Sequence, residues 1–256
     1  MIPYFPQPVL HLGPFQIHAF GFLAALAVVL GGRVVLLRAH RQGIPAEQMF
    51  QFCCWTYLFG MVCAVLAKLM LDDFPAFFVD PVHAFRANLG FRSVGGIGGA
   101  FVGALLWCRW KRLSLFDTIR RVDIVAYATP FAWMIGRLGC TLAHDHRGLF
   151  TASWIAVRFP EGPRYDLGFI EFLFLIPLTI AFKLLDRKPR PVGFYFALFG
   201  IVYGGFRIWL DTLHAQPLRF YGGALGVLVG LSGWAWMWAQ ERSFGITRPL
   251  HMSRST

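Results

Sequence analysis

The sequence predicts an all-α polytopic membrane protein, with about seven transmembrane helices and a small extracytoplasmic subdomain. Three observations support this fold class. Hydrophobic residues make up 57% of the 256 residues and charged residues only 14%, which is more apolar than a soluble core of this size requires. The apolar residues fall into separate segments, and the basic residues gather in the connections on one side of them. We therefore expect a single integral membrane domain over residues 1–256.

Most of the seven apolar segments reach the ~20 residues that a helix needs to cross ~30 Å of hydrocarbon. They are Ile17–Leu37, Met49–Leu71, Val94–Cys108, Val122–Leu142, Gly168–Leu185, Val192–Leu213 and Phe220–Gln240. The first has no Lys or Arg before it and is too long for a signal-peptide core, so we expect it to be kept as a span. The third is short and rich in glycine, so it either crosses or forms a re-entrant element.

The charges in the connections predict the orientation. Fourteen Lys and Arg residues lie on the side of the odd-numbered connections and the C-terminal tail. The other side holds six, which are Arg86, Arg92, Arg147, Arg158, Arg164 and Arg219. The positive-inside rule therefore predicts that the N-terminus lies outside and the C-terminus in the cytoplasm. The net charge of +11 is then a topology signal and a contact with anionic lipid, not a sign of nucleic-acid binding.

Residues 143–167 form the longest irregular stretch outside the apolar segments. The stretch contains Pro160 and Pro163, and Ser153–Phe159 alternates in a way that favours a strand. We expect a small extracytoplasmic subdomain here, inserted between spans four and five and covering a site in the membrane.

Two arginines lie inside apolar segments, Arg137 in AWMIGRLGCTL and Arg207 in IVYGGFRIWLD. An arginine in the middle of a bilayer costs about 2.5–3.5 kcal/mol on insertion scales, so it usually faces a polar cavity with a function. Asp145 and Asp211 follow the two arginines at short range, and the predicted topology places all four in the outer half of the bilayer. This pattern indicates an anion-handling site. The alternative for Arg207 and Asp211, four residues apart, is a structural ion pair.

The run His144, Asp145 and His146 follows Arg137 closely. If Arg137 binds a phosphate with its planar donors, this run can supply proton transfer or orientation. The alternative is that the arginine extends to the interface and the run is a solvated loop. Adjacent ligands with no third partner are a weak metal signal, and the five cysteines show no CxxC pair and no metal-ligand spacing. We therefore predict neither a metal nor an organic cofactor.

Glycines recur every four residues in VGGIGGAFVGALL, at Gly95, Gly99 and Gly103. Such spacing predicts close helix packing in a membrane. The alternative is that Gly95 and Gly96 open the backbone to a phosphate group. Glu171, near the start of the fifth segment, is either an interfacial residue or part of the site.

Five short motifs follow one another along nearly the whole chain. They are IHAFG with His18, SVGGIGG with Gly95 and Gly96, GRLGCTLAHDHRG with Gly136, Arg137, Gly139, Asp145 and Gly148, RYDLGFIE ending at Glu171, and YGGFRIWLD with Tyr203, Arg207 and Asp211. In this order they resemble the motifs of the prolipoprotein diacylglyceryl transferase family of bacterial inner membranes. The chain departs from the family pattern at four positions. Val94 replaces a histidine, Cys140 and Ala143 replace asparagines, and Phe20 replaces a tyrosine.

The resemblance implies transfer of a diacylglyceryl group from phosphatidylglycerol to the lipobox cysteine thiol of a prolipoprotein, which forms a thioether. For this reaction we expect Arg137 and Arg207 to hold the phosphate and Asp145 and Asp211 to orient those guanidinium groups or the glycerol hydroxyls. We expect His144 or His146 to be the thiol base. The residues expected to bind substrate are Gly95, Gly96, Gly136, Gly139, Gly148, Glu171, Tyr203, Asp211 and His18. The alternative is a divergent member that binds lipid without catalysis or transfers a different lipid group.

Overall fold

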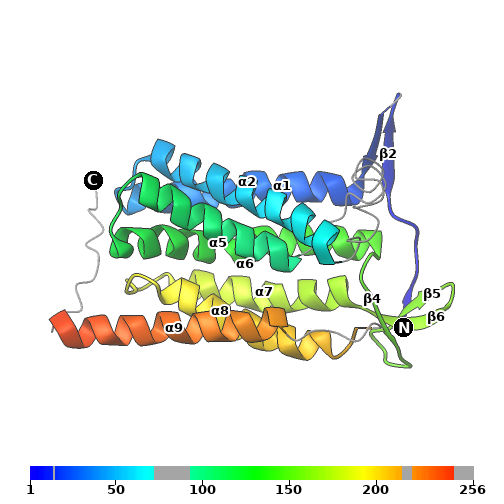
Figure 1. The fold of residues 1–256 in the computed structure, drawn as a ribbon. Coiled ribbons are helices and arrows are strands. Elements are labelled where there is room, and N and C mark those ends of the chain that lie inside the picture. Colours follow the sequence, from blue (N-terminus) through cyan, green and yellow to red (C-terminus); the bar gives the residue numbers. More distant parts are fainter. Residues whose placement is uncertain (14, 72–92, 215–220, 245–256) are drawn as a thin grey trace. The chain divides into compact units, whose positions relative to one another are not determined.

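The structure, a computed structural model, describes residues 1–13, 15–71, 93–214 and 221–244. Within these residues the chain forms seven α-helices and six short strands (Figure 1). The helices are α1 (Ala19–Arg41), α2 (Ala46–Leu71), α5 (Ser93–Trp110), α6 (Leu115–Ala143), α7 (Leu167–Leu185), α8 (Phe194–Asp211) and α9 (Tyr221–Phe244). The strands are β1 (Ile2–Pro3), β2 (Val9–Leu12), β3 (Phe15–His18), β4 (Arg147–Phe150), β5 (Val157–Phe159) and β6 (Gly162–Asp166).

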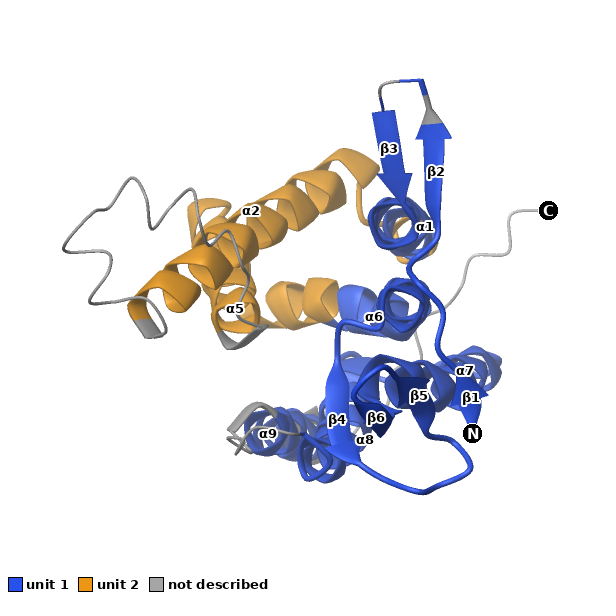
Figure 2. Ribbon diagram, turned by 90° about the vertical axis from the view of Figure 1, so that its right-hand side faces the viewer, with its two compact units in different colours: residues 1–38, 123–256 blue, residues 39–122 orange. Residues whose placement is uncertain are grey.

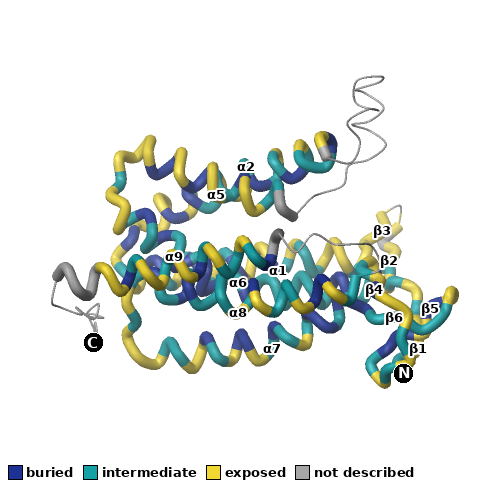
Figure 3. The backbone as a smooth tube through the Cα atoms, turned by 60° about the horizontal axis from the view of Figure 1, so that its bottom comes forward, coloured by how far each residue is buried: buried dark blue, intermediate teal, exposed yellow. Residues whose placement is uncertain are grey.

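Each described helix coincides with one of the predicted apolar segments. Three helices are long and apolar enough to cross a membrane, over Ala19–Arg41, Ala46–Met70 and Leu167–Leu185. Large apolar side chains such as Val29 and Leu66 are exposed, and exposed residues recur along the helices in Figure 3. So many exposed apolar side chains suit lipid and not water. The prediction of a helical membrane protein is confirmed. The count of seven crossings stays a prediction.

Helix α6 begins at Leu115, well before the predicted apolar segment starts at Val122. Its first turn is stabilised by Ser114, whose hydroxyl oxygen accepts a hydrogen bond from the backbone N–H of Asp117 at 3.1 Å. This is an N-cap, which satisfies a backbone donor that the helix leaves unpaired. Hydropathy alone misses such a turn because the turn is held by its cap and not by burial.

The chain divides into two compact units, residues 39–122 and residues 1–38 with 123–256 (Figure 2). In the first unit, α2 and α5 pack through the glycine face of α5. A side chain at Gly95 would collide with the backbone carbonyl of Cys63, and one at Gly99 with that of Phe59. The spacing of these glycines therefore has the helix-packing role that the sequence predicts.

In the second unit, α6, α7 and α8 enclose a hydrophobic core. Its buried residues are Tyr127, Leu175, Leu178, Phe182 and Tyr195. Helix α9 packs on α8 through small residues, since a side chain at Gly204 would lie 2.7 Å from the backbone nitrogen of Val227. The core residues come from all three helices, α6, α7 and α8. The ionic cluster of the candidate site lies on the same helices.

A four-stranded sheet lies at one end of α6, α7 and α8, with strand order β1-β5-β6-β4 (Figure 1). Strands β5 and β6 form an antiparallel hairpin that turns at Gly162, which has a φ of 125°. The backbone N–H of Leu149 in β4 donates to the carbonyl of Leu213, just after α8. Of the predicted strand Ser153–Phe159, only Val157–Phe159 is extended. Strand β6 runs directly into α7, which fixes where that helix begins.

Candidate active site

Glu171 of α7 is the centre of an ionic cluster that joins α6, α7 and α8. Its side chain is 1% exposed. Oε1 forms an ion pair with Nε of Arg137 at 2.8 Å and accepts a hydrogen bond from the hydroxyl of Tyr203 at 2.6 Å. Oε2 accepts a hydrogen bond from Nη1 of Arg207 at 3.2 Å. A buried carboxylate is tolerated when its charge is paired and its lone pairs are used, and Glu171 meets both conditions.

Asp211 binds the second arginine of the cluster. Its Oδ1 lies 2.9 Å from Nε of Arg207. Tyr203, Arg207 and Asp211 follow one another at intervals of four, so they share one face of α8. The Arg207–Asp211 ion pair that the spacing suggested does form. The same guanidinium also reaches Glu171, so the pair is part of a larger network.

Both guanidinium groups keep one amino group outside these pairings. Arg137 uses Nε for Glu171, and its Nη1 lies 3.4 Å from Nε2 of His146. Arg207 uses Nε for Asp211 and Nη1 for Glu171. Among the residues that the structure describes, Nη2 of either arginine therefore has no hydrogen-bond acceptor. A guanidinium held in this way has donors available for an anion.

The start of α7 is set by Asp166, and this places Glu171 in the second turn of the helix. The side chain of Asp166 accepts a hydrogen bond from the backbone N–H of Phe169 at 3.1 Å, as an N-cap residue does. Its other oxygen lies 2.6 Å from Nδ1 of His144. Burial raises the pKa of Asp166, and the hydrogen bond with His144 acts in the opposite direction.

The two histidines of the HDH run lie in different surroundings. His144 ends α6 in the left-handed conformation, with a φ of 51°, and is buried. The rings of Tyr4 and Phe5 pack against it, with centroids at 5.1 and 4.7 Å. With Asp166 on its Nδ1, this histidine links α6, the N-terminal segment and α7. A role for His144 as thiol base stays a prediction, and the geometry favours His146 for it.

His146 lies at the cluster and is partly exposed. Its Nδ1 is 2.5 Å from Oδ1 of Asp145, and its Nε2 faces Nη1 of Arg137. The same Nη1 lies 3.7 Å from Sγ of Cys140. Arg137, Asp145 and His146 are therefore brought together as the sequence predicted, and Cys140 joins them.

His214 adjoins the cluster just after the end of α8. The residue forms an isolated β-bridge with Gly148 of β4. Burial, with the positive charge of Arg207 acting in the same direction, lowers its pKa to about 4. His214 is therefore neutral near neutral pH. No motif or spacing signals this position, because the contact with Gly148 is made between distant parts of the chain.

Two of the predicted glycines have packing roles. A side chain at Gly139 would lie 3.4 Å from Cα of Phe20 in α1. One at Gly148 would lie 2.6 Å from the carbonyl oxygen of Leu213. Gly136 has open space at its missing side chain. These glycines allow α1 and β4 to approach the helices that carry the cluster.

Three predicted substrate-binding residues belong to elements other than those that carry the cluster. Gly95 and Gly96 lie in α5, in the compact unit of residues 39–122. His18 is exposed at the end of β3. Their proposed contact with the lipid stays a prediction.

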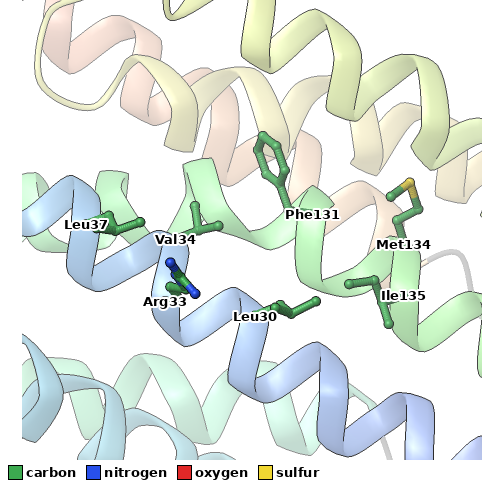
Figure 4. A pocket seen from close by; sticks show the side chains of 7 residues that line it. All are labelled: Leu30, Arg33, Val34, Leu37, Phe131, Met134 and Ile135. Carbon is green, nitrogen blue, oxygen red and sulfur yellow. The ribbon is translucent and has the colours of Figure 1, made fainter.

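A separate apolar cavity of about 320 Å³ lies between α1 and α6 (Figure 4). Its lining includes Leu30, Val34, Phe131 and Met134, with Arg33 at its edge. It shares no residue with the ionic cluster, and its walls carry almost no polar atoms.

The fold and the cluster together define a helical membrane protein with a buried, arginine-rich polar site. The profile of the prolipoprotein diacylglyceryl transferase family matches residues 7–239, so the chain belongs to this family. The chain is 28% identical to a phosphatidylglycerol–prolipoprotein diacylglyceryl transferase of Pseudoalteromonas atlantica, over 88% of this chain and 84% of the relative. Identity to the protein of the same name from Sodalis glossinidius is 28%, over 88% and 87%. For Escherichia coli it is 26%, over 86% and 84%.

Proposed function

We propose that the protein transfers a diacylglyceryl group from phosphatidylglycerol to the thiol of a prolipoprotein cysteine. The observation that carries this proposal is the pair of guanidinium groups held by Glu171, each with Nη2 available. The names of the relatives supply the two substrates. They favour a transferase over the alternative of a silent lipid-binding protein.

The reaction needs a thiolate at one end and a stabilised phosphate at the other. Attack of the sulfur on the glyceryl carbon breaks the C–O bond to the phosphate, and glycerol phosphate leaves with the electron pair. Nη2 of Arg137 and Nη2 of Arg207 would donate hydrogen bonds to the negatively charged oxygens of that phosphate. Glu171, Tyr203 and Asp211 fix the two guanidinium groups, so the donors need no reorganisation during the reaction.

His146 is the favoured base for the acceptor thiol. Its Nδ1 pairs with Asp145, which orients the ring, and its Nε2 lies on the side of Arg137. The neutral imidazole can take the thiol proton and yield the thiolate that attacks.

The proposed setting is the bacterial inner membrane, with seven crossings, the N-terminus outside and the C-terminus in the cytoplasm. Residues 143–167 would then be an extracytoplasmic subdomain, because they follow a helix that runs outward. The cluster would lie in the outer half of the bilayer, where an outer-leaflet lipid and a translocated prolipoprotein both have access. The distribution of Lys and Arg supports this orientation.

The test is transfer in vesicles that contain phosphatidylglycerol, with a fluorescent lipobox peptide as acceptor. The wild type should form lipidated peptide. Arg137→Lys should lose about 100-fold in rate, because a lysine cannot reproduce a forked contact. Arg147→Lys is the matched control, since Arg147 pairs with Glu161 on the surface of the sheet and should keep full rate. Full turnover by Arg137→Lys would overturn the phosphate assignment.

A further inference from the structure

Strands β2 and β3 form a hairpin that has one apolar face and one polar face. Leu10 pairs with Ile17 across the strands, and Phe15 lies two positions from Ile17, so these three residues share one face. They are called the apolar hairpin face. His11 pairs with Gln16 on the opposite, polar hairpin face. The hairpin is therefore amphipathic, and two strands are too few to bury its apolar side.

The apolar hairpin face is exposed. Leu10 is 58% exposed, Phe15 72% and Ile17 37%. No Asp, Glu, Lys or Arg precedes Arg33 in the sequence, so the hairpin lacks the charged residues that usually protect exposed strands from association in water. An isolated two-stranded hairpin is only marginally stable in water. We therefore expect this face to be covered by something outside the described part of the chain.

The hairpin lies across the end of a helix that can span a membrane. Strand β3 ends at His18, and α1, which is long and apolar enough to cross a bilayer, begins at Ala19. The backbone N–H of Ala19 donates to the carbonyl of Pro8 at 3.0 Å, which holds the base of the hairpin at the helix. In Figure 1 and Figure 2 the two strands run across the axis of α1 and not along it. When α1 spans a bilayer, the hairpin therefore lies along the plane of the membrane boundary.

Lipid fits this face better than a protein partner does. Exposed apolar side chains continue along the chain into α1, where Phe20 is 40% and Phe22 is 59% exposed. A membrane boundary accepts a flat apolar face and aromatic rings without a matching pocket. We propose that the apolar hairpin face lies in phospholipid at the boundary that the first turn of α1 enters, with the polar hairpin face toward water. This docking goes beyond the proposed transferase function, and its tests need no activity.

The proposed docking also restrains the sheet beside the candidate site. Strand β1 pairs with β5, and the rings of Tyr4 and Phe5 pack on His144. Only residues 6–8, two of them proline, separate Phe5 from β2. This connection is short and stiff. A hairpin anchored in lipid would therefore keep the N-terminal segment, and the sheet that it joins, close to the membrane surface.

The first experiment compares two adjacent positions on opposite faces of the hairpin. A fluorescent amino acid replaces Phe15 in one protein and Gln16 in a matched control, and the full chain is placed in nanodiscs of phosphatidylglycerol and phosphatidylcholine. Quenching is measured with nitroxide-labelled lipids and with iodide in the water. The probe at position 15 should be quenched by the labelled lipids. Iodide should quench it at least about 5-fold less than the probe at position 16, because it lies below the headgroups.

Three results of this experiment would overturn the docking. Equal quenching by iodide at the two positions would place both faces in water. Protection of position 15 from both quenchers would mean that another part of the protein covers the face. Lipid quenching at position 15 that is lost on addition of a lipobox signal peptide would assign the face to that peptide.

The second experiment measures the rate at which chymotrypsin cleaves after Phe15 in the same nanodiscs. Leu10→Glu places a charge on the apolar hairpin face and should raise this rate about 10-fold, because the hairpin is released from lipid. His11→Glu, at the next residue on the polar hairpin face, should leave the rate unchanged. Since Leu10 is exposed, both variants should keep the wild-type melting temperature, which distinguishes release from unfolding. Equal rates in the two variants would contradict the docking.

Discussion

Two arginine clusters occur in the same compact unit, and they differ in what covers their guanidinium groups. Arg38 of α1 forms an ion pair with Asp186 at 2.6 Å. Its guanidinium lies 3.8 Å from the ring centre of Tyr127 and 4.7 Å from that of Tyr195. The carboxylate satisfies the charge and the two aromatic faces cover the plane. This arginine holds α1 to the end of α7.

The cluster around Glu171 is built differently. There one carboxylate serves two guanidinium groups, and no aromatic ring is recorded over either of them in the described residues. Arginine, an acid and tyrosine thus form a cluster covered by aromatic rings around Arg38. The same residue types form a cluster without such a cover around Glu171. We infer that the uncovered guanidinium groups serve catalysis and that the covered one serves stability, and the following matched substitutions test this.

The largest effect is expected from the central acids. Glu171→Gln removes the charge that holds Arg137 and Arg207 at one point, so the two guanidinium groups should separate. A displacement of this kind should lower the rate of transfer about 100-fold. The matched variant Asp186→Asn should lower the melting temperature but keep the rate per folded molecule. Equal loss of rate in both variants would contradict the distinction between the clusters.

The same contrast between rate and stability is expected for the two histidines of the HDH run, His144 and His146. His146→Gln should lower the rate about 10–100-fold, because the thiol base is lost, with little change in melting temperature. His144→Gln should keep the rate of the folded protein. It should cost about 1–3 kcal/mol of stability, because Asp166 loses a buried partner. Thermal unfolding and transfer assays on both variants check this, and a reversed pattern would assign the base to His144.

The two tyrosines give a smaller contrast. The hydroxyl of Tyr203 donates to Glu171 at 2.6 Å, and that of Tyr195 donates to Asp186 at 3.1 Å. Tyr203→Phe should lower the rate about 10-fold, since a hydrogen bond to a charged group contributes roughly 1.5–3 kcal/mol. Tyr195→Phe should cost about 1 kcal/mol of stability and leave the rate unchanged. Steady-state kinetics and melting temperatures, measured together, distinguish the two.

The sequence predicted the helices well because a long apolar segment is identified directly from the residues that make it up. The arginines inside these segments were also visible, since a charge in an apolar stretch is rare. The sequence did not show which of these polar residues form pairs with one another. Nothing in the spacing shows that Glu171 joins both arginines or that His144 turns away to Asp166, because these contacts depend on how α6, α7 and the sheet meet.

The same limit applies to Arg38 and Cys140. Arg38 directly follows the predicted segment Ile17–Leu37, but in the structure it lies within α1 and is covered by aromatic rings. Cys140 was noted only as a departure from the family motif, and it precedes Asp145 by five positions. Its proximity to Asp145 and His146 comes from the left-handed turn at His144, which no local propensity would indicate.

The smallest expected effect is a change in pH dependence at His214. Burial and nearby positive charge lower its pKa to about 4 in the folded protein, against about 6.5 for an unperturbed histidine. Between these values the unfolded chain binds a proton that the folded chain does not, so stability falls as pH falls through this window. Above pH 7 both states are neutral and the term vanishes. His214→Gln should therefore flatten the fall in melting temperature from pH 6.5 to pH 4 and leave the value at pH 7.5 nearly unchanged. A profile as steep as that of the wild type would show that His214 is not held neutral beside Arg207. In that case the imidazole would be better hydrated than its partly buried position after α8 implies.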